Sequence, residues 1–495
     1  MTTTTSNSNS NSNSNSNDAA SQTSAASQAS EQTAAKHYDL VIIGTGSANS
    51  IPNESFENKS IAIIEKGKFG GTCLNVGCIP TKMFVYAADI ALAARSSQHL
   101  GVHGEVTKVD WNSIVERVFA NRIDLIAEGG ENYRRGDECP NIDVYAGHAK
   151  FVGPKTLTVV GAGENGEDCT VTGDEVVIAT GSRPMIPAPI AESGARYYTN
   201  EDIMRLDKQP ESMIIVGAGF IAMEFAHVFH GLGTEVTVAV RGQELLKHLD
   251  ADIKSRFNQA MVEAVDVRFG INVAKVEDTA AGVRVTYDDG STQEAEILLV
   301  ATGRIPNGDQ MNLEAAGIEM RNDGRVKVDD FGRTTADGVW ALGDVSSPYM
   351  LKHVANAETR AIQHNLLHPE DLRAMPHEHV PSAIFTHPQI ATVGLTEDEA
   401  RDAGFDITVK VQNYGDVAYG WAMNDSQGIC KLIADRKNGR LLGAHYYGEQ
   451  ASTLIQQMIQ VMAFDQDVRE VATQQYWIHP ALPELTENAL LGLEF

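Results

Sequence analysis

The stretch Tyr38-Asp-Leu-Val-Ile-Ile-Gly44-Thr-Gly46-Ser-Ala-Asn49 is a short apolar run that enters a glycine-containing turn. An unbroken apolar run of this length is typical of a buried strand. The first glycine permits a tight turn, and the second lets the backbone approach a pyrophosphate at the start of a helix. Glu65 ends the next predicted strand, residues 60–65, where a carboxylate can bind ribose hydroxyls. The pattern therefore predicts a nucleotide-binding βαβ unit.

The same pattern returns in Ser212-Met-Ile-Ile-Val-Gly217-Ala-Gly219-Phe-Ile-Ala222, again a strand, a glycine turn and the start of a helix. Each copy closes with an apolar strand followed by Ala-Thr-Gly, at residues 175–181 and 297–303. The chain therefore contains an internal duplication of two nucleotide-type units.

The strand after the second turn, residues 233–241, ends in Arg241, where an NAD-specific site places an acid. Lys247 lies six residues further on. Two cations here suit the 2′-phosphate of NADPH, so NADPH is preferred over NADH. The alternative is that both are ordinary solvated surface cations.

Two of the five cysteines lie in Phe69-Gly-Gly-Thr-Cys73-Leu-Asn-Val-Gly-Cys78-Ile-Pro-Thr-Lys82. Pro80 suits the start of a helix, expected over residues 80–94, whose dipole and free N–H groups would lower the pKa of the nearby thiol. A zinc site needs a second cysteine pair, which the sequence lacks. A structural disulfide is unusual in a reducing compartment. Cys73 and Cys78 are therefore predicted to be a redox-active pair.

Composition indicates an ordinary globular chain of 495 residues, long enough for about three domains. The net charge of −27 argues against nucleic acid and anionic membrane as partners. Five cysteines, odd in number and mostly far apart, are typical of a reducing cytoplasm. The first 36 residues are rich in Ser, Thr, Asn and Ala, lack an apolar signal-peptide core, and are expected to form a disordered polar tail. The longest apolar run, residues 213–229, contains glycines and is predicted to be strand–turn–helix, not a membrane span.

The sequence pattern changes after Gly343-Asp344. Residues 368–379, rich in His, Pro and Glu, are expected to be a linker, and an α+β domain should follow. Near the end, His479-Pro-Ala-Leu-Pro-Glu484 combines a histidine with a carboxylate. A carboxylate that holds one imidazole nitrogen fixes the tautomer and raises basicity, which suits general acid–base catalysis. The alternative is an incidental histidine near the C-terminus.

Taken together, the two turns, the Gly-Gly-Thr-Cys-Leu-Asn-Val-Gly-Cys-Ile-Pro-Thr-Lys segment and the His/Glu pair resemble the pyridine nucleotide–disulfide oxidoreductase family over residues 38–495. The resemblance implies an α/β fold with two Rossmann-like (three-layer ββα) nucleotide-binding domains plus a C-terminal α+β dimerisation domain. It implies FAD on the first unit, NADPH on the second, and no metal. The implied divisions are a tail at 1–36, an FAD-binding domain in two parts at 37–182 and 303–367, an NADPH-binding domain at 183–302 and a dimerisation domain at 378–495.

The resemblance also implies roles for single residues. Asp344 would bind the FAD ribityl chain, residues 350–353 would lie near the flavin ring, and Lys82 and Glu224 would form an ion pair beside flavin N5. The implied catalytic residues are Cys73, Cys78, His479, Glu484, Lys82 and Glu224. The implied cofactor-binding residues are Gly44, Gly46, Glu65, Gly71, Thr72, Lys82, Gly147, Ala149, Thr180, Gly181, Ser182, Gly217, Gly219, Phe220, Ile221, Arg241, Lys247, Gly303, Arg304, Gly343, Asp344, Leu351 and His353.

In the family the C-terminal histidine reaches the cysteines of the other subunit, which implies a homodimer with shared active sites and a small-molecule disulfide as substrate. Cys78 would form the thiolate–flavin charge-transfer pair, Cys73 would attack the substrate, and His479 would protonate the leaving thiol. Residues 78–86, 416–423 and 476–484 resemble one branch, whose substrate is the disulfide of a sugar-linked thiol. Glutathione reductase and dihydrolipoamide dehydrogenase are the alternatives within the family, and a non-enzymatic flavoprotein sensor is an alternative outside it.

One departure from the family pattern lies in the first turn. Its third position is Asn49, and Pro52 interrupts the helix that the family places there. Altered FAD packing is expected at this point.

Overall fold

The computed structural model describes residues 35–495, so nearly all of the expected polar tail lies outside the described residues. The first nucleotide-type unit is built on a sheet in the order β3-β2-β1-β6-β5-β4, with β16 also paired to β6. The strands are β1 (Lys36–Ile43), β2 (Ile61–Glu65), β3 (Ile142–Ala146), β4 (His148–Gly153), β5 (Thr156–Val160), β6 (Cys169–Ile178) and β16 (Val339–Ala341). The helices of this unit are α1 (Gly71–Asn75), α2 (Cys78–Ser96), α3 (Trp111–Val118), α4 (Asp124–Arg135) and α8 (Lys352–Leu367).

Strand β1 is buried on both faces of this sheet. Leu40 and Ile42 belong to one hydrophobic cluster, and Val41 and Ile43 belong to another. This double burial explains why the sequence shows an unbroken apolar run rather than alternation. Because β1 pairs in parallel with β2 and β6, the carboxyl ends of the three strands meet at one edge, where the glycine turn lies.

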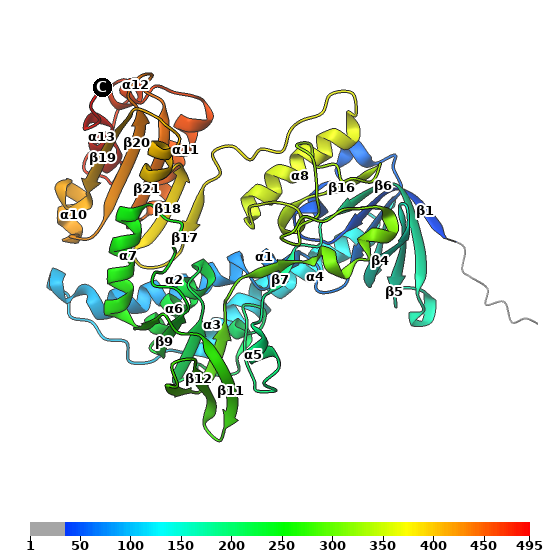
Figure 1. Ribbon diagram of the computed structural model, residues 1–495, viewed down its shortest axis with the longest axis horizontal. Coiled ribbons are helices and arrows are strands. Elements are labelled where there is room, and N and C mark those ends of the chain that lie inside the picture. Colours follow the sequence, from blue (N-terminus) through cyan, green and yellow to red (C-terminus); the bar gives the residue numbers. More distant parts are fainter. Residues whose placement is uncertain (1–34) are drawn as a thin grey trace, which may run out of the picture. The chain divides into compact units, whose positions relative to one another are not determined.

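The chain leaves this sheet and later returns to it. Strand β16 pairs in parallel with β6 and lies near helix α8 (Figure 1). A small antiparallel sheet pairs β7 (Ser182–Pro184), where the chain leaves the first unit, with β15 (Arg304–Pro306), where it returns. The inserted segment between them carries the second nucleotide-type unit.

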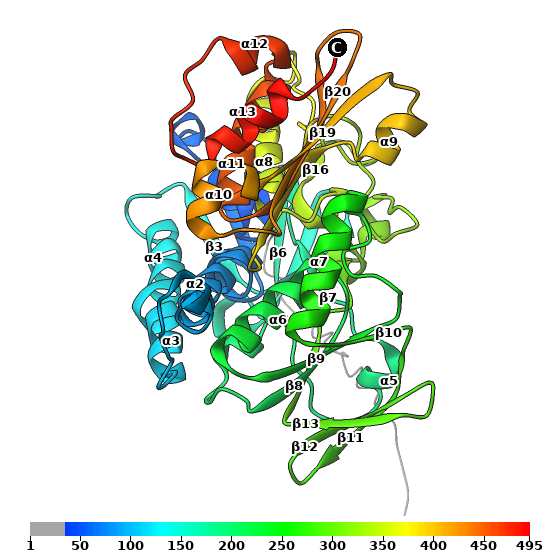
Figure 2. The same cartoon turned by 90° about the vertical axis from the view of Figure 1, so that its left-hand side faces the viewer.

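The second unit has three layers. Its parallel sheet has the order β10-β9-β8-β14, and an antiparallel sheet has the order β11-β12-β13 (Figure 2). One hydrophobic cluster joins residues of both sheets, and another joins the parallel sheet to its helices. The elements are α5 (Ala188–Ala191), β8 (Ser212–Val216), α6 (Phe220–Leu232), β9 (Glu235–Val240), α7 (Ala251–Ala264), β10 (Asp266–Phe269), β11 (Val273–Thr279), β12 (Gly282–Tyr287), β13 (Thr292–Ala295) and β14 (Ile297–Val300).

The C-terminal domain is an antiparallel sheet in the order β17-β18-β21-β20-β19, with helices beside it. Residues 368–381, which include the expected linker, contain no helix or strand. The elements are β17 (Ser382–Ile384), β18 (Gln389–Gly394), α9 (Glu397–Asp402), β19 (Ile407–Asn413), α10 (Ala418–Met423), β20 (Ile429–Asp435), β21 (Leu441–Gly448), α11 (Ala451–Ala463), α12 (Val468–Thr473) and α13 (Pro483–Leu491). The predicted fold class is confirmed.

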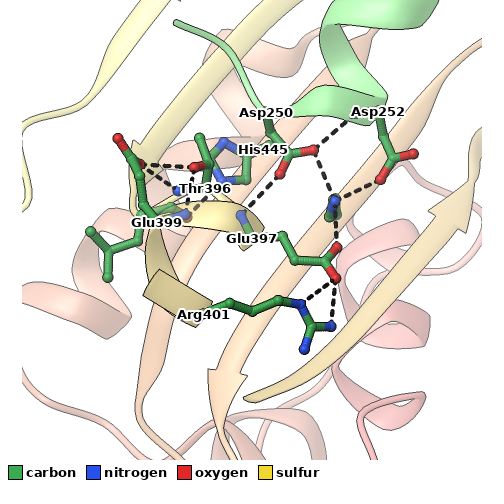
Figure 3. Close-up of polar contacts among 9 residues, drawn as sticks. Asp250, Asp252, Thr396, Glu397, Glu399, Arg401 and His445 are labelled. Atoms are coloured by element: carbon green, nitrogen blue, oxygen red, sulfur yellow. Dashed lines mark hydrogen bonds and ion pairs between the residues drawn. The ribbon is translucent and has the colours of Figure 1, made fainter. Parts of the chain in front are cut away.

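A buried ionic cluster joins the second unit to the C-terminal domain. The Lys431 ammonium on β20 lies 2.9 Å from Asp250, 2.6 Å from Asp252 and 2.8 Å from Glu397. Figure 3 shows the three carboxylates converging, with Arg401 on the outer side of Glu397. Asp250 is the N-cap of α7 and also accepts the N–H of Glu397. Each charge in the buried centre is therefore paired, as burial of ions requires.

The apolar run at residues 213–229 forms β8, the second turn and α6, as predicted. A different stretch, Gly71–Leu100, is long and apolar enough to cross a membrane by length and composition. Its Phe84, Val85 and Ala88 are buried in the same hydrophobic cluster as α6, so here it is a helix packed within the protein.

Candidate functional site

The two glycine turns have the same construction. Gly44 and Gly217 have φ of +107° and +144°, and a side chain on either would lie within 2.3 Å of the carbonyl oxygen of Ala179 or Ala301. Those alanines begin the two Ala-Thr-Gly segments, which explains why the segment recurs with the turn. At Gly46 and Gly219 a side chain would meet nothing within 4 Å. The backbone is therefore open at the second glycine of each turn, as the approach of a pyrophosphate requires.

Glu65 is tied to the first turn. One carboxylate oxygen accepts the Thr45 N–H at 3.0 Å and its hydroxyl at 2.6 Å, and the other accepts the Gly67 N–H at 2.9 Å. The Thr45 hydroxyl also accepts the N–H of Gly70, just before the cysteine-bearing helix. No role was predicted for Thr45 from the sequence, although its position between the two glycines of the turn indicates one.

Asn49 and Pro52 lie in an irregular segment. A single 3-10 turn, Ser47–Ser50, follows the glycines in place of a long helix. Arg134 on α4 donates to the Asn49 side chain at 3.1 Å, to its carbonyl at 2.5 Å and to the Pro52 carbonyl at 3.3 Å. This buried guanidinium, which no local sequence signal predicts, replaces the helical hydrogen bonds.

Cys73 lies in α1, and Cys78 is the first residue of α2, so the helix begins two residues before the expected Pro80. Both thiols are free, with Cys73 half-buried and Cys78 exposed. The hydrogen bond from Cys78, two N–H groups at the start of α2 and the charge of Lys352 lower the pKa of Cys73 to about 7, against its burial. The pKa of Cys78 is raised because it keeps the proton that it donates to Cys73, because it is partly buried and because Asp344 is near.

The hydrogen bond between the two thiols favours ionisation of Cys73, and N–H groups at the start of α2 add to this effect. The roles implied by the resemblance, Cys78 as the thiolate beside the flavin and Cys73 as the nucleophile, stay predictions. A thiolate on Cys73 is suited to nucleophilic attack on a disulfide.

The expected ion pair of Lys82 and Glu224 does not form as a direct contact within residues 35–495. The Lys82 ammonium lies over the Phe385 ring, 4.2 Å from its centroid, and Glu224 accepts the Phe385 N–H at 3.0 Å. Burial raises the pKa of Glu224 to about 7, and burial lowers the pKa of Lys82. Phe385 thus holds both groups near each other, and their charges still interact.

Ser182, Arg304 and Asp344 come from distant parts of the chain and form one network. The Ser182 hydroxyl donates to Asp344 at 2.6 Å and accepts from Arg304 at 2.7 Å, and Arg304 lies 4.0 Å from Asp344. Glu358 is buried, accepts the Gly343 N–H at 2.7 Å, and thereby fixes the backbone beside Asp344. Sequence inspection did not identify Glu358, since nothing in a helix interior marks such a contact.

The remaining predicted residues of the first unit lie on several different elements. Thr180 has a buried hydroxyl that finds no hydrogen-bond partner within residues 35–495, and Gly181 next to it has open space at its α-carbon. The Gly147 N–H donates to the Glu65 carbonyl at 2.9 Å. His353 points elsewhere, toward the Pro381 carbonyl at 2.8 Å. Gly71 and Thr72 lie in α1, Ala149 in β4, Gly303 just before β15, and Leu351 caps α8.

In the second unit, the predicted cations lie near the turn. Arg241 directly follows β9 and Lys247 follows Leu246, whose N–H donates to the Ala218 carbonyl within the turn at 3.0 Å. Both cations are exposed. Phe220 and Ile221 begin α6.

These residues fit the two expected cofactors. The open second glycine, the acid Glu65 and the orphaned Thr180 hydroxyl suit FAD in the first unit. The second open turn with two exposed cations suits NADPH.

His479 and Glu484 form the predicted dyad. The His479 Nδ1 lies 2.7 Å from the Glu484 carboxylate, and the imidazole is 70% exposed. Within residues 35–495, His479 makes no hydrogen bond to the cysteine loop of its own chain. Ile478 beside it is 73% exposed and Tyr476 is fully exposed, so apolar surface surrounds the dyad.

Comparison with known proteins supports the same assignment. Residues 38–361 match the family model described as pyridine nucleotide-disulphide oxidoreductase, and residues 380–490 match its dimerisation domain. Mycothione reductase of Mycobacterium tuberculosis is 54% identical over 92% of this chain and 99% of the relative. Glutathione reductase of Burkholderia cepacia is 32% identical over 85% of this chain and 91% of the relative. An HOCl-induced flavoprotein disulfide reductase of Escherichia coli superposes with a TM-score of 0.81 at 27% identity, covering 92% of this chain and all of that one.

Proposed function

Because the chain belongs to the pyridine nucleotide–disulphide oxidoreductase family, and is an NAD(P)H-dependent flavoprotein that reduces a low-molecular-weight disulfide, we propose that its substrate is mycothione, the disulfide of mycothiol. The observation that supports mycothione as the substrate is the 54% identity to a mycothione reductase along 99% of that relative. The 32% identity to a glutathione reductase is far lower. The resemblance of residues 78–86, 416–423 and 476–484 to the same branch agrees with it.

FAD and NADPH are the cofactors. When bound, NADPH would supply a hydride, and FAD would relay its two electrons to the Cys73–Cys78 disulfide. The residues that would hold FAD are those of the first turn, Glu65, Thr180, Asp344 and its network, and those that would hold NADPH are the second turn, Arg241 and Lys247. Ser182 and Arg304 orient the Asp344 carboxylate, and Glu358 fixes the N–H beside it.

The reduced pair then acts on the substrate. The Cys73 thiolate attacks one sulfur of the substrate disulfide, so a Cys73–substrate disulfide forms, the substrate S–S bond breaks, and the first thiol leaves with a proton from His479. Cys78 loses its proton to the dyad and attacks Cys73, which closes the protein disulfide and releases the second thiol as a thiolate. Glu484 holds His479 Nδ1, which leaves Nε2 directed outward for both proton transfers.

The protein is a homodimer, and we propose that each active site takes its dyad from the partner subunit. The support is the high exposure of His479 amid exposed apolar side chains, and the absence of any hydrogen bond from it to the cysteine loop within the described part of its own chain.

Mixed dimers test this arrangement. Cys73→Ser chains and His479→Gln chains are co-refolded or co-expressed in equal amounts. If the dyad acts across the dimer, each mixed dimer has one intact site, and random pairing restores about a quarter of wild-type activity. If the dyad acts within its own chain, no mixed dimer has an intact site and activity stays at the level of the parent variants.

Substrate choice is tested by NADPH oxidation with mycothiol disulfide, glutathione disulfide and lipoamide as acceptors. We expect mycothiol disulfide to give the highest kcat/KM, and the Cys73→Ser variant to lose turnover with it. A rate with glutathione disulfide that equals or exceeds the rate with mycothiol disulfide would reject mycothione as the substrate. We also propose a reducing cytoplasmic location, consistent with five free thiols, which cell fractionation checks.

A further inference from the structure

The backbone carbonyl of Val76 lies in the loop between the two cysteines, and the helix that follows cannot supply its hydrogen bond. Val76 is outside both α1 and α2, and its N–H donates back to the Thr72 carbonyl at 2.9 Å. A helix-type bond to the Val76 carbonyl would need an N–H four residues later, where Pro80 has none. This partly buried carbonyl therefore needs a donor from elsewhere in the chain.

Asn200 supplies that donor from a distant part of the chain. Its side-chain Nδ2 donates to the Val76 carbonyl at 2.9 Å, and its Oδ1 accepts from the Arg304 guanidinium at 3.2 Å. The residue is only 7% exposed. Both ends of the amide are thus used, and the two contacts together determine that the N–H end faces the cysteine loop.

Asn200 is itself held by the sheet of the second unit. Tyr198, two residues earlier, exchanges backbone hydrogen bonds of 2.8 Å with β14 on both sides. Arg304, which follows β14, donates to the Ser182 hydroxyl at 2.7 Å, and that hydroxyl donates to Asp344 at 2.6 Å. A continuous chain of hydrogen bonds therefore joins the carbonyl between the two cysteines to the carboxylate that would bind FAD.

The cysteine loop is so closely packed that a movement of Val76 must move its neighbours. A side chain on Gly77 would lie 3.0 Å from the Thr72 carbonyl oxygen and 3.2 Å from the Cys73 α-carbon. Cys73 lies three residues before Val76, and Cys78 lies two residues after it. A contact that fixes the Val76 carbonyl therefore restricts the positions of both sulfurs.

We propose that Asn200 is a positioning residue of the redox pair, whose amide holds the loop in the geometry in which the sulfurs of Cys73 and Cys78 bond to each other. This inference rests on the proposed redox role of the pair. Asn200 takes no part in the chemistry: closing the protein disulfide removes two electrons and two protons from the two thiols, and an acceptor disulfide takes them up to become two thiols. A fixed loop raises the effective concentration of one sulfur at the other, which favours the closed disulfide.

The test measures the equilibrium between the cysteine pair and dithiothreitol in the FAD-loaded enzyme without NADPH. The reduced pair and oxidised dithiothreitol give the protein disulfide and reduced dithiothreitol. Alkylation, followed by mass spectrometry of the peptide that contains both cysteines, gives the fraction of the pair that is oxidised. Asn200→Leu removes both contacts of the amide, whereas Asn200→Asp removes the donor and keeps an acceptor for Arg304.

Asn141 offers a matched control in the first unit. Its amide donates to the carbonyls of Phe56 and Lys59 at 3.0 and 2.9 Å, so Asn141→Leu and Asn141→Asp remove the same kind of hydrogen bond. Asn141 directly precedes β3, which is parallel to β2, and therefore lies at the edge of the sheet opposite the glycine turn.

We expect both Asn200 variants to lower the equilibrium constant for disulfide formation about tenfold, the effect of losing one buried hydrogen bond. Both Asn141 variants should stay within about twofold of the wild type, because distant sites do not couple. NADPH oxidation with mycothiol disulfide should fall in the Asn200 variants. NADPH oxidation with ferricyanide, which takes electrons directly from reduced FAD, should not change.

A wild-type equilibrium constant in either Asn200 variant overturns the inference, since a shift in Asn200→Asp alone is an effect of its negative charge. An equal shift in the Asn141 variants also overturns it, because the effect would then be general destabilisation. A parallel fall with ferricyanide does the same, because the contact would then serve the flavin. If Asn200→Leu does not fold, Asn200→Ala takes its place and is read by the same criterion.

Failure of this inference is distinguishable from failure of the proposed function. If Cys73 and Cys78 form no disulfide in the wild type, the proposed redox role fails, and the inference fails with it. If the wild type forms the disulfide and the Asn200 variants form it equally well, only the inference fails. The dithiothreitol equilibrium does not depend on which disulfide the enzyme reduces, which the acceptor panel decides.

Discussion

Replacing Lys431 by Met tests how the second nucleotide unit is held to the C-terminal domain. The Lys431 and Asp250 side chains are only 2% and 1% exposed, so the variant leaves the Asp250 carboxylate buried without its cation. Glu397 keeps its ion pair with Arg401, and Asp252 is half exposed to solvent (Figure 3). Most of the loss of stability should therefore come from Asp250.

The loss in the free energy of unfolding follows from the partners that Asp250 loses and keeps. Removing one partner of a buried ion pair costs about 3–5 kcal/mol. Because Asp250 retains two backbone N–H donors, from Asp252 and Glu397, we expect a value near the lower end, about 3 kcal/mol. For a cooperatively unfolding chain of this length, the specific unfolding entropy converts that loss into a fall of about 3 °C in the thermal midpoint.

The assay is a thermal scan of the holoenzyme at fixed FAD concentration, protein concentration and scan rate. Burial opposes ionisation of Asp250, but hydrogen bonds from Lys431 and the Glu397 N–H outweigh it and hold its pKa below the usual range. In the wild type the Asp250 contribution is therefore present above the unfolded pKa and lost as the pH falls through the folded pKa. In the variant the orphaned carboxyl takes up a proton more readily, so the deficit should be largest at pH 8 and smaller at pH 5.

Two controls sharpen the result. Asp252→Asn removes a half-exposed partner and should cost less than about 1 kcal/mol. Asp250→Asn combined with Lys431→Met removes both buried charges, so the double variant should be more stable than the two single losses predict when added. A wild-type midpoint for Lys431→Met at pH 8, or strict additivity in the double variant, would refute the reasoning.

Further predictions concern the cofactor and redox sites. Because burial raises the pKa of Glu224 from 4.5 to about 7, the folded protein binds the extra proton and loses about 3 kcal/mol as the pH rises from about 4.5 to 7. Glu224→Gln, which keeps the acceptor for the Phe385 N–H, should therefore have a higher thermal midpoint than the wild type at pH 8 and an equal one at pH 4; equal midpoints at pH 8 would contradict the cause. Arg241→Glu should raise KM for NADPH at least about tenfold with little change for NADH, because it repels the 2′-phosphate; steady-state kinetics with both nucleotides measures this, and a parallel change for both would exclude that contact. Arg134→Met should leave the carbonyls of Asn49 and Pro52 without their donor and cost about 1–3 kcal/mol, seen as a lower midpoint and weaker retention of FAD on dialysis; unchanged FAD retention would show that the irregular turn needs no anchor.

Much of the fold and part of the site were predictable from the sequence, because the signals are local. A strand followed by a glycine turn depends on residues within a few positions, and it recurs in both units with its Ala-Thr-Gly segment. The cysteine spacing, the start of a helix near Pro80 and the His479–Glu484 pair are local in the same sense. Their interactions are set by backbone geometry over one or two turns, so they could be read before any tertiary contact was known.

Tertiary structure alone decided the rest, because those contacts join residues far apart in the chain. Lys352 and Ser47 are separated by 305 positions, Arg134 and Asn49 by 85, and Lys431 and Asp250 by 181. No spacing rule connects such pairs, and each charged side chain among them would alone be taken for an ordinary surface charge. The sequence thus determined the two-cofactor fold and predicted that Cys73 and Cys78 are its redox pair. Packing brought the Lys352 and Asp344 charges close enough to act on the two thiols, because both come from a much later part of the chain.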